Sequence, residues 1–247
     1  MGATMSDDFD AIVGDIDDEL DLTLYADAAE LSEEVTVQIL AAIEKGLKLK
    51  SQFHLVLTGG TLGVQISEAL VHEFNADPDG FAGLHIWWSD ERFVQADSLE
   101  RNAFPFHKTV TNTAVVIHEV LASDVAKSID DAVSDYALAL ENVDIDLNIL
   151  GLGPDGHVAS LFPGIADVDD LRTIFAITDS PKPPAARVSF TMSMINSADE
   201  VWIVAAGESK AEAVTKIIEG DLAIPASYVR GNSHTRLIVD TEAFFSE

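Results

Sequence analysis

Apolar and polar residues along the chain follow two periods, one typical of buried strands and one typical of helices. Short apolar runs that end at glycine, proline or aspartate indicate strands, and apolar residues at every third or fourth position indicate helices. The runs predict strands at residues 22–25, 53–57, 84–88, 115–120, 146–150, 173–178, 187–190, 200–205 and 236–239. Helices are predicted at about residues 26–47, 62–74, 124–142 and 209–219.

Strands and helices alternate through most of the sequence, which is the pattern of an α/β fold. We therefore expect a single α/β domain over residues 21–247, with a mostly parallel sheet flanked by helices on both faces. Proline-containing turns at residues 77–80 and 180–184 are interpreted as connections within this domain. The acidic residues 1–20 are predicted to form a disordered tail.

Composition narrows the class of protein. The chain has 247 residues, 47% of them hydrophobic, which is enough for one sizeable core. The absence of cysteine excludes disulfides and thiolate chemistry. A net charge of −29 with only 14 lysines and arginines makes nucleic acid and anionic membranes unsuitable partners. The N-terminus is unlike a signal peptide, and no apolar run approaches the ~20 residues of a membrane span. A cytoplasmic enzyme or binding protein fits best.

The strand predicted at residues 146–150 ends in a turn that carries glycines, an acid and a histidine. These residues are Gly151, Gly153, Asp155, Gly156 and His157. In an open α/β sheet such a turn lies where ligands bind, and histidine is suited to proton transfer near neutral pH. The glycine spacing also matches the dinucleotide fingerprint, but that motif needs a long helix directly after it. Pro154 and the turn at 163–164 leave no room for one, so a polar functional loop is favoured. A tight turn that contains a histidine by chance is the remaining alternative.

A second glycine turn, Gly59-Gly60-Thr61, joins a predicted strand to a predicted helix. Glycines let the backbone approach an anion closely, and the free N–H groups at a helix start point toward it. The Thr61 hydroxyl adds a donor. This signal is weak by itself, because strand-to-helix turns often contain glycine for steric reasons.

Charged residues cluster after the predicted strands. Arg92, Arg187 and Lys210 lie in turn-rich segments and together favour an anionic substrate, although each alone is more typical of a surface ion pair. Lys210 stands at a helix start, where the helix dipole disfavours a cation, so a contact with phosphate is expected. Asp90 and Glu91, next to Arg92, suit a polyol with an anionic end; a helix N-cap is the equally open alternative. The remaining histidines show no ligand spacing, and no metal is predicted.

Four motifs resemble the glucosamine-6-phosphate isomerase/6-phosphogluconolactonase family: TGGT at 58–61, WWSDERFV at 87–94, GLGPDGHVASLFPG at 151–164, and Pro183-Pro184 with Arg187. Their order and spacing agree from about residue 22 to the C-terminus. Arg92 stands where the deaminases of this family have tyrosine, and Phe162 stands where they have a catalytic glutamate. Both residues favour the lactonase branch. Leu62-Gly63 and Arg101-Asn102 depart from the common lactonase pattern.

The resemblance implies a Rossmann-like fold of the glucosamine-6-phosphate deaminase/ribose-5-phosphate isomerase type. It also implies hydrolysis of 6-phospho-D-glucono-1,5-lactone in the oxidative pentose phosphate pathway, without a cofactor. His157 would be the general base that activates water, and Asp90 and Asp155 would be the other catalytic residues. The expected substrate-binding residues are Gly59, Gly60, Thr61, Arg92, Gly153, Gly156, Arg187 and Lys210.

A small-molecule sugar-phosphate lactone is the only partner expected, and the chain is expected to be a monomer or a weak homo-oligomer. Two alternatives stay open. One is a sugar-phosphate deaminase, and the other is a non-catalytic sugar-phosphate-binding protein on the same fold.

Overall fold

Seven parallel strands form the central sheet of the protein, for which the computed structural model describes residues 20–77 and 79–245. Across the sheet their order is β1 (Leu20–Tyr25), β10 (His234–Asp240), β9 (Glu200–Ala205), β6 (Leu147–Gly151), β2 (Phe53–Leu57), β3 (Leu84–Trp88) and β5 (Val116–Ile117). Every neighbouring pair is parallel, so all the carboxyl ends meet at one edge. The predicted class, an α/β fold with a mostly parallel sheet flanked by helices, is confirmed.

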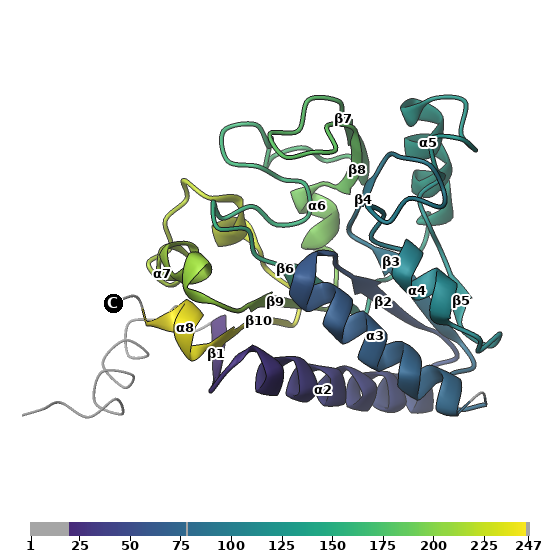
Figure 1. Cartoon of the computed structure of the whole chain (residues 1–247), viewed down its shortest axis with the longest axis horizontal. Helices are drawn as coiled ribbons and strands as arrows, with labels where there is room; N and C mark the ends of the chain where they lie inside the picture. Colours follow the sequence, from purple (N-terminus) through teal and green to yellow (C-terminus); the bar gives the residue numbers. More distant parts are fainter. Residues whose placement is uncertain (1–19, 78, 246–247) are drawn as a thin grey trace, which may run out of the picture.

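Helices cover both faces of this sheet (Figure 1). One face packs against α2 (Ala28–Leu49), α3 (Gly60–Ala76) and α4 (Phe104–Thr109). The other packs against α5 (Ile129–Ala139), α6 (Met192–Ile195), α7 (Ala211–Ile218) and α8 (Thr241–Phe244). Successive strand residues point to opposite faces, so Trp88 joins the first apolar cluster and Trp87 the second. Both tryptophans are buried core residues.

A second, antiparallel sheet differs from the sequence prediction. It consists of β4 (Asp90–Arg92), β8 (Arg187–Phe190) and β7 (Ile174–Ile177). The last two were expected in the main sheet, and Asp90–Arg92 was expected as a polar cluster at a strand end. Instead the chain leaves the parallel sheet after Trp88 and pairs with β8, which places Arg92 opposite Arg187. Apolar residues of β7 and β8 belong to the same cluster as the main strands, so the small sheet shares their core.

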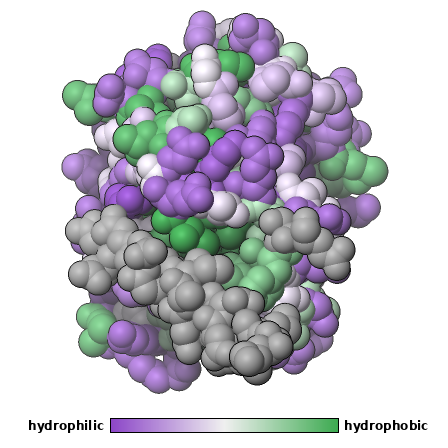
Figure 2. Space-filling model, turned by 90° about the vertical axis from the view of Figure 1, so that its left-hand side faces the viewer, coloured by the Kyte–Doolittle hydropathy of each residue, from purple (hydrophilic) through white to green (hydrophobic). Residues whose placement is uncertain are grey.

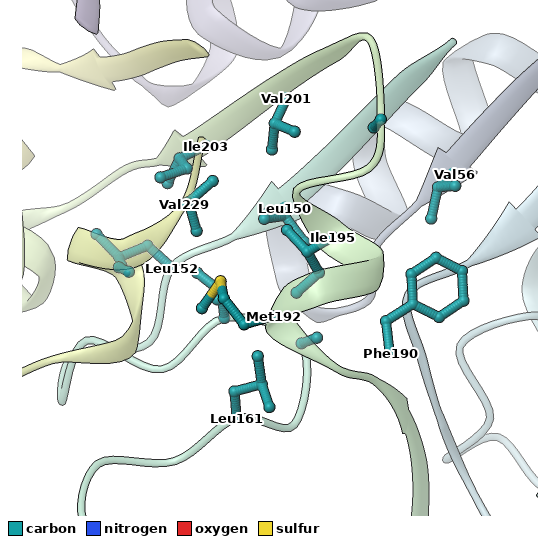
Figure 3. Packing of buried hydrophobic residues seen from close by; sticks show 14 of the residues in the cluster. Val56, Leu150, Leu152, Leu161, Phe190, Met192, Ile195, Val201, Ile203 and Val229 are labelled. Atoms are coloured by element: carbon teal, nitrogen blue, oxygen red, sulfur yellow. The ribbon is translucent and has the colours of Figure 1, made fainter. Parts of the chain in front are cut away.

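Figure 3 shows this shared cluster from close by. Leu150 and Ile203 come from the main sheet, and Phe190 comes from β8. Leu152 and Leu161, which flank the predicted functional loop, are buried in the same cluster. The loop between them is therefore anchored at both ends by apolar packing.

Several predicted boundaries shift by a few residues. Helix α5 begins only at Ile129, because the Ser128 side chain caps it by accepting a hydrogen bond from the Asp131 N–H. The strand predicted at 115–120 is reduced to the two residues of β5, and α3 begins earlier than expected, at Gly60. One helix was predicted at residues 209–219. The structure has instead a short 3₁₀ turn, Glu208–Lys210, followed by α7. The predicted acidic tail lies outside the described residues, apart from Leu20, which begins β1.

Hydrophilic residues predominate in the upper half of the face drawn in Figure 2. This agrees with a chain that carries 43 acidic residues. None of the helices in the described part of the chain is long and apolar enough to cross a membrane.

Candidate active site

A cleft of about 210 Å³ opens at the edge of the sheet where the carboxyl ends of β2, β3 and β6 meet. This is the edge at which open α/β sheets bind ligands. The cleft is lined by residues that lie far apart in the sequence, including Gly59, Gly60, Asp90, Arg92, Gly153, His157, Lys182, Arg187 and Lys210. Most of the residues predicted for the site are therefore brought together.

His157 and Asp155 form a close pair beside this cleft. The Nδ1 atom of His157 lies 2.5 Å from Oδ1 of Asp155. Burial alone would raise the pKa of Asp155, but its contacts with His157 and Lys182 outweigh this and lower the pKa to about 2. An ionised carboxylate only accepts hydrogen bonds, so Nδ1 carries the proton. The Nε2 atom, which has no hydrogen-bond partner in the described part of the chain, is left as the acceptor.

Burial also acts on His157 itself. The imidazole side chain is 17% exposed, and burial lowers its pKa below the ordinary value, although Asp155 pulls it upward. The lowered pKa keeps the ring neutral near pH 7, which is the form that a general base requires.

The glycines of this loop have separate structural roles. The Gly153 N–H donates to the His157 carbonyl at 2.8 Å, which closes the turn. A Cβ atom at Gly153 would collide with the His157 ring, so only glycine leaves room for the pair. Gly156 has φ +80° and packs against Ile224. It was expected to bind substrate, but it does not line the cleft, and its place in the turn explains why glycine stands there.

Lys182 is a site residue that the sequence reasoning missed. Its Nζ atom donates to Oδ1 of Asp155 at 3.1 Å and lies 3.2 Å from Nδ1 of His157. One signal for Lys182 was present in the sequence: the chain has few basic residues, and this one lies in a proline-rich loop five residues before Arg187. The structure shows that this loop folds over the His157 turn.

Asp90 borders the cleft, but both of its carboxylate oxygens have protein partners. Ser160 Oγ donates to Oδ2 at 2.6 Å, and Asn102 Nδ2 donates to Oδ1 at 3.0 Å. The guanidinium of Arg187 lies 3.7 Å from Oδ2. Asp90 is thus firmly oriented in the wall, and Asn102 is a second residue that sequence reasoning did not select.

Asn102 is itself held in place by a buried carboxylate, that of Glu91. Glu91 is 1% exposed and accepts hydrogen bonds from the N–H groups of Arg92, Asn102 and Ala103 at 2.8, 2.6 and 3.0 Å. Arg101 lies 3.7 Å away and is also buried, and it donates to the Val120 carbonyl at 2.7 Å. Arg101, whose sequence context was unusual, therefore fixes the wall from behind and does not line the cleft.

The two arginines of the cleft differ in how many of their N–H donors are free to bind a ligand. Arg187 donates to the carbonyls of Pro184, Lys182 and Pro183 at 3.1 to 3.2 Å, so most of its donors hold the loop. Arg92 donates from Nη1 to the Glu100 carbonyl at 2.6 Å, while its Nη2 has no hydrogen-bond partner among the described residues. Arg92 is therefore the better candidate for a direct contact with a bound molecule.

A second cleft of about 470 Å³ adjoins the first and shares Gly59, Gly60 and Lys210 with it. Thr61 lines this second cleft. Helix α3 begins here without a side-chain cap, so the N–H groups of its first turn remain available to an anion. Burial, followed by the charge of Lys182, lowers the pKa of Lys210 from its ordinary value. Lys210 makes no ion pair within the described residues.

Four of the 14 basic residues thus line one small cleft in a strongly acidic protein. Positive charge with an uncapped helix start favours a small anion. Within residues 20–77 and 79–245, no cluster of three or more histidine or acidic side chains is arranged to hold a metal ion.

The fold and the cleft together define an α/β protein in which a carboxylate-paired histidine stands beside a cleft lined by four basic residues. The model of the family described as glucosamine-6-phosphate isomerases/6-phosphogluconolactonase matches residues 26–239. The chain therefore belongs to this family.

Several relatives of the chain are 6-phosphogluconolactonases, in agreement with this family. The chain is 31% identical to the 6-phosphogluconolactonase of Streptomyces coelicolor, over 90% of this chain and 92% of that protein. It is 37% identical to the 6-phosphogluconolactonase of Rattus norvegicus, over 73% of this chain and 75% of that protein. The crystal structure of 6-phosphogluconolactonase from Thermotoga maritima superposes with a TM-score of 0.77 at 26% identity, covering 90% of this chain and all of that one.

Proposed function

We propose that this protein is a 6-phosphogluconolactonase, which hydrolyses 6-phospho-D-glucono-1,5-lactone to 6-phospho-D-gluconate in the oxidative pentose phosphate pathway. The observation that carries the proposal is the His157–Asp155 pair at the wall of a cleft lined by four basic residues. The family membership and the 6-phosphogluconolactonase relatives support the same substrate.

In the proposed reaction His157 is the general base. Its Nε2 atom takes a proton from a water molecule as the water oxygen bonds to the lactone carbonyl carbon. The bond from that carbon to the ring oxygen then breaks. The imidazolium returns its proton to the ring oxygen, which becomes a hydroxyl group, and the new carboxylic acid ionises. Asp155 holds the ring and stabilises the imidazolium between the two transfers.

The geometry favours different tasks for the cations. We assign the phosphate to the Lys210 end, where the Gly59-Gly60-Thr61 backbone opens α3 and the second cleft leaves room. Arg92, whose Nη2 has no hydrogen-bond partner among the described residues, and Lys182, beside His157, line the other end. They would stabilise the negative charge that develops on the carbonyl oxygen.

The wild-type protein tests this proposal in a coupled assay with freshly generated lactone, corrected for spontaneous hydrolysis. We expect lactone opening well above the spontaneous rate and no ammonia release from glucosamine-6-phosphate. Ammonia release without lactone opening would establish the deaminase alternative. Tight binding of 6-phosphogluconate without any acceleration would instead establish a binding protein.

A further inference from the structure

Phe162 is an unusual buried aromatic residue. It is 1% exposed and among the largest fully buried side chains, yet it belongs to neither of the two apolar clusters that form the core. Its ring contacts side chains of the candidate active site instead. The ring centroids of Phe162 and His157 are 4.7 Å apart at an angle of 37°.

Two cations of the site also lie against this ring. The Nζ atom of Lys182 is 5.9 Å from the centroid of the Phe162 ring, and the Cζ atom of Arg187 is 5.7 Å from it. Both distances are within the range of a cation–π contact. One apolar ring thus lies against the candidate base, against Lys182 of the proline-rich loop and against Arg187 at the start of β8.

The backbone around Phe162 is well fixed. Leu161, directly before it, is buried in the core cluster and pairs with Val158 in an isolated bridge. The Phe162 carbonyl accepts hydrogen bonds from the N–H groups of Ile165 and Ala166 at 3.1 and 2.9 Å. The ring is therefore held by the chain itself and can serve as a rigid support.

We propose that Phe162 is a positioning residue, whose ring holds the His157 imidazole and the cations of Lys182 and Arg187 in their relative places. The inference rests on the proposed function only for its effect on turnover. Phe162 touches no substrate atom in this scheme and acts through His157.

The ring also decides how much water reaches the imidazole. The charged groups that face His157 are Asp155, Lys182 and Asp90, and burial is the largest influence on its pKa. Without the aromatic ring, water enters beside the imidazole and Lys182 loses one side of its support. The pKa of His157 then moves upward toward its ordinary value.

The test compares Phe162→Leu and Phe162→Met with the control Phe74→Leu. Phe74 is also fully buried, but its ring packs against Phe81 and Phe106 in the other core cluster. Methionine keeps much of the apolar volume, so this variant tests the ring even if the leucine variant does not fold. The His157 imidazole is titrated by NMR in each protein without substrate, and kcat and KM are then measured with the lactone.

We expect the pKa of His157 to rise by roughly half a unit or more in both Phe162 variants and to stay unchanged in Phe74→Leu. We expect kcat to fall about tenfold in the Phe162 variants, with KM nearly constant, because a displaced base affects the chemical step more than binding. A titration of His157 in the Phe162 variants that matches the control would overturn the inference. Because the titration needs no substrate, an inactive wild-type protein would refute the proposed function while leaving this result readable.

Discussion

The Nδ1 atom of His157 lies 2.5 Å from Oδ1 of Asp155, two residues earlier in the same turn. A pair so close in sequence can form only because Gly153 leaves space where any side chain would collide with the ring. The contact fixes which nitrogen carries the proton, and it leaves Nε2 of this cleft-lining residue as the acceptor.

Replacing Asp155 by asparagine tests this role directly. An asparagine amide can donate to Nδ1, which would place the ring proton on Nε2 and remove its ability to accept a proton from water. We therefore expect Asp155→Asn to lower kcat by about 10²-fold or more, the scale seen when the acceptor behind a catalytic histidine is neutralised. The rate of lactone opening by the wild-type and variant proteins at neutral pH measures this change in kcat.

The matched control is Glu212→Gln, which neutralises a surface acid paired with Lys216 on α7. It should leave kcat unchanged. Equal effects of the two substitutions would show that overall charge, and not the orientation of His157, determines the rate.

Lys210 is expected to contribute to substrate binding more than to the chemical step. Replacing it by methionine removes a half-buried charge beside the start of α3 but keeps most of the apolar length. A hydrogen bond to a charged group is worth about 1.5–3 kcal/mol, so KM should rise by roughly 10- to 100-fold with little change in kcat. Lys216→Met, which removes a lysine from α7 outside the two clefts, should change neither constant. A fall in kcat at constant KM would instead place Lys210 at the reacting carbonyl.

The histidines that sequence reasoning left as structural predict how stability depends on pH. His54, His85 and His118 contact one another beside Trp87, with His118 stacked on the indole at 3.7 Å between centroids. Burial, then neighbouring charges that include His85, lowers the pKa of both His54 and His118 to about 4. The folded state thus favours the neutral rings.

These lowered pKa values mean that the free energy of unfolding decreases as the pH falls. An unfolded histidine titrates near pH 6.5, so the stabilisation is complete above that pH and is lost as the pH falls through 4. His118→Phe keeps a ring on Trp87 and removes one titrating group. We expect it to reduce the loss of unfolding free energy between pH 7 and pH 4 by on the order of 1–2 kcal/mol. Melting curves across this range that coincide in shape with those of the wild type would contradict the prediction.

The sequence was sufficient for the parts of the fold that depend on local patterns. Buried parallel strands are nearly continuous apolar runs, so β2, β3 and β6 and the loops after them could be located from the order of apolar and polar residues alone. The small antiparallel sheet could not, because the pairing of β4 with β8 joins residues almost a hundred positions apart.

The site followed the same division. Asp90 and His157 could be selected from the sequence because each follows an apolar run and has a side chain suited to proton transfer. Lys182 and Asn102 were missed because their importance arises only from contacts across the fold, with Asp155 and with Asp90. Gly156 shows the limit from the other side, because the sequence cannot separate a glycine that binds a ligand from one that a turn requires, and the structure gives Gly156 a positive φ and a close approach to Ile224.

The most direct test of the account is the turnover of His157→Ala with 6-phospho-D-glucono-1,5-lactone, measured beside the wild type after correction for spontaneous hydrolysis. Loss of a general acid–base group predicts a fall in kcat of about 10²–10⁴-fold, with an unchanged circular dichroism spectrum. A variant that opens the lactone as fast as the wild type would show that His157 is not the base, and the proposed mechanism would be wrong.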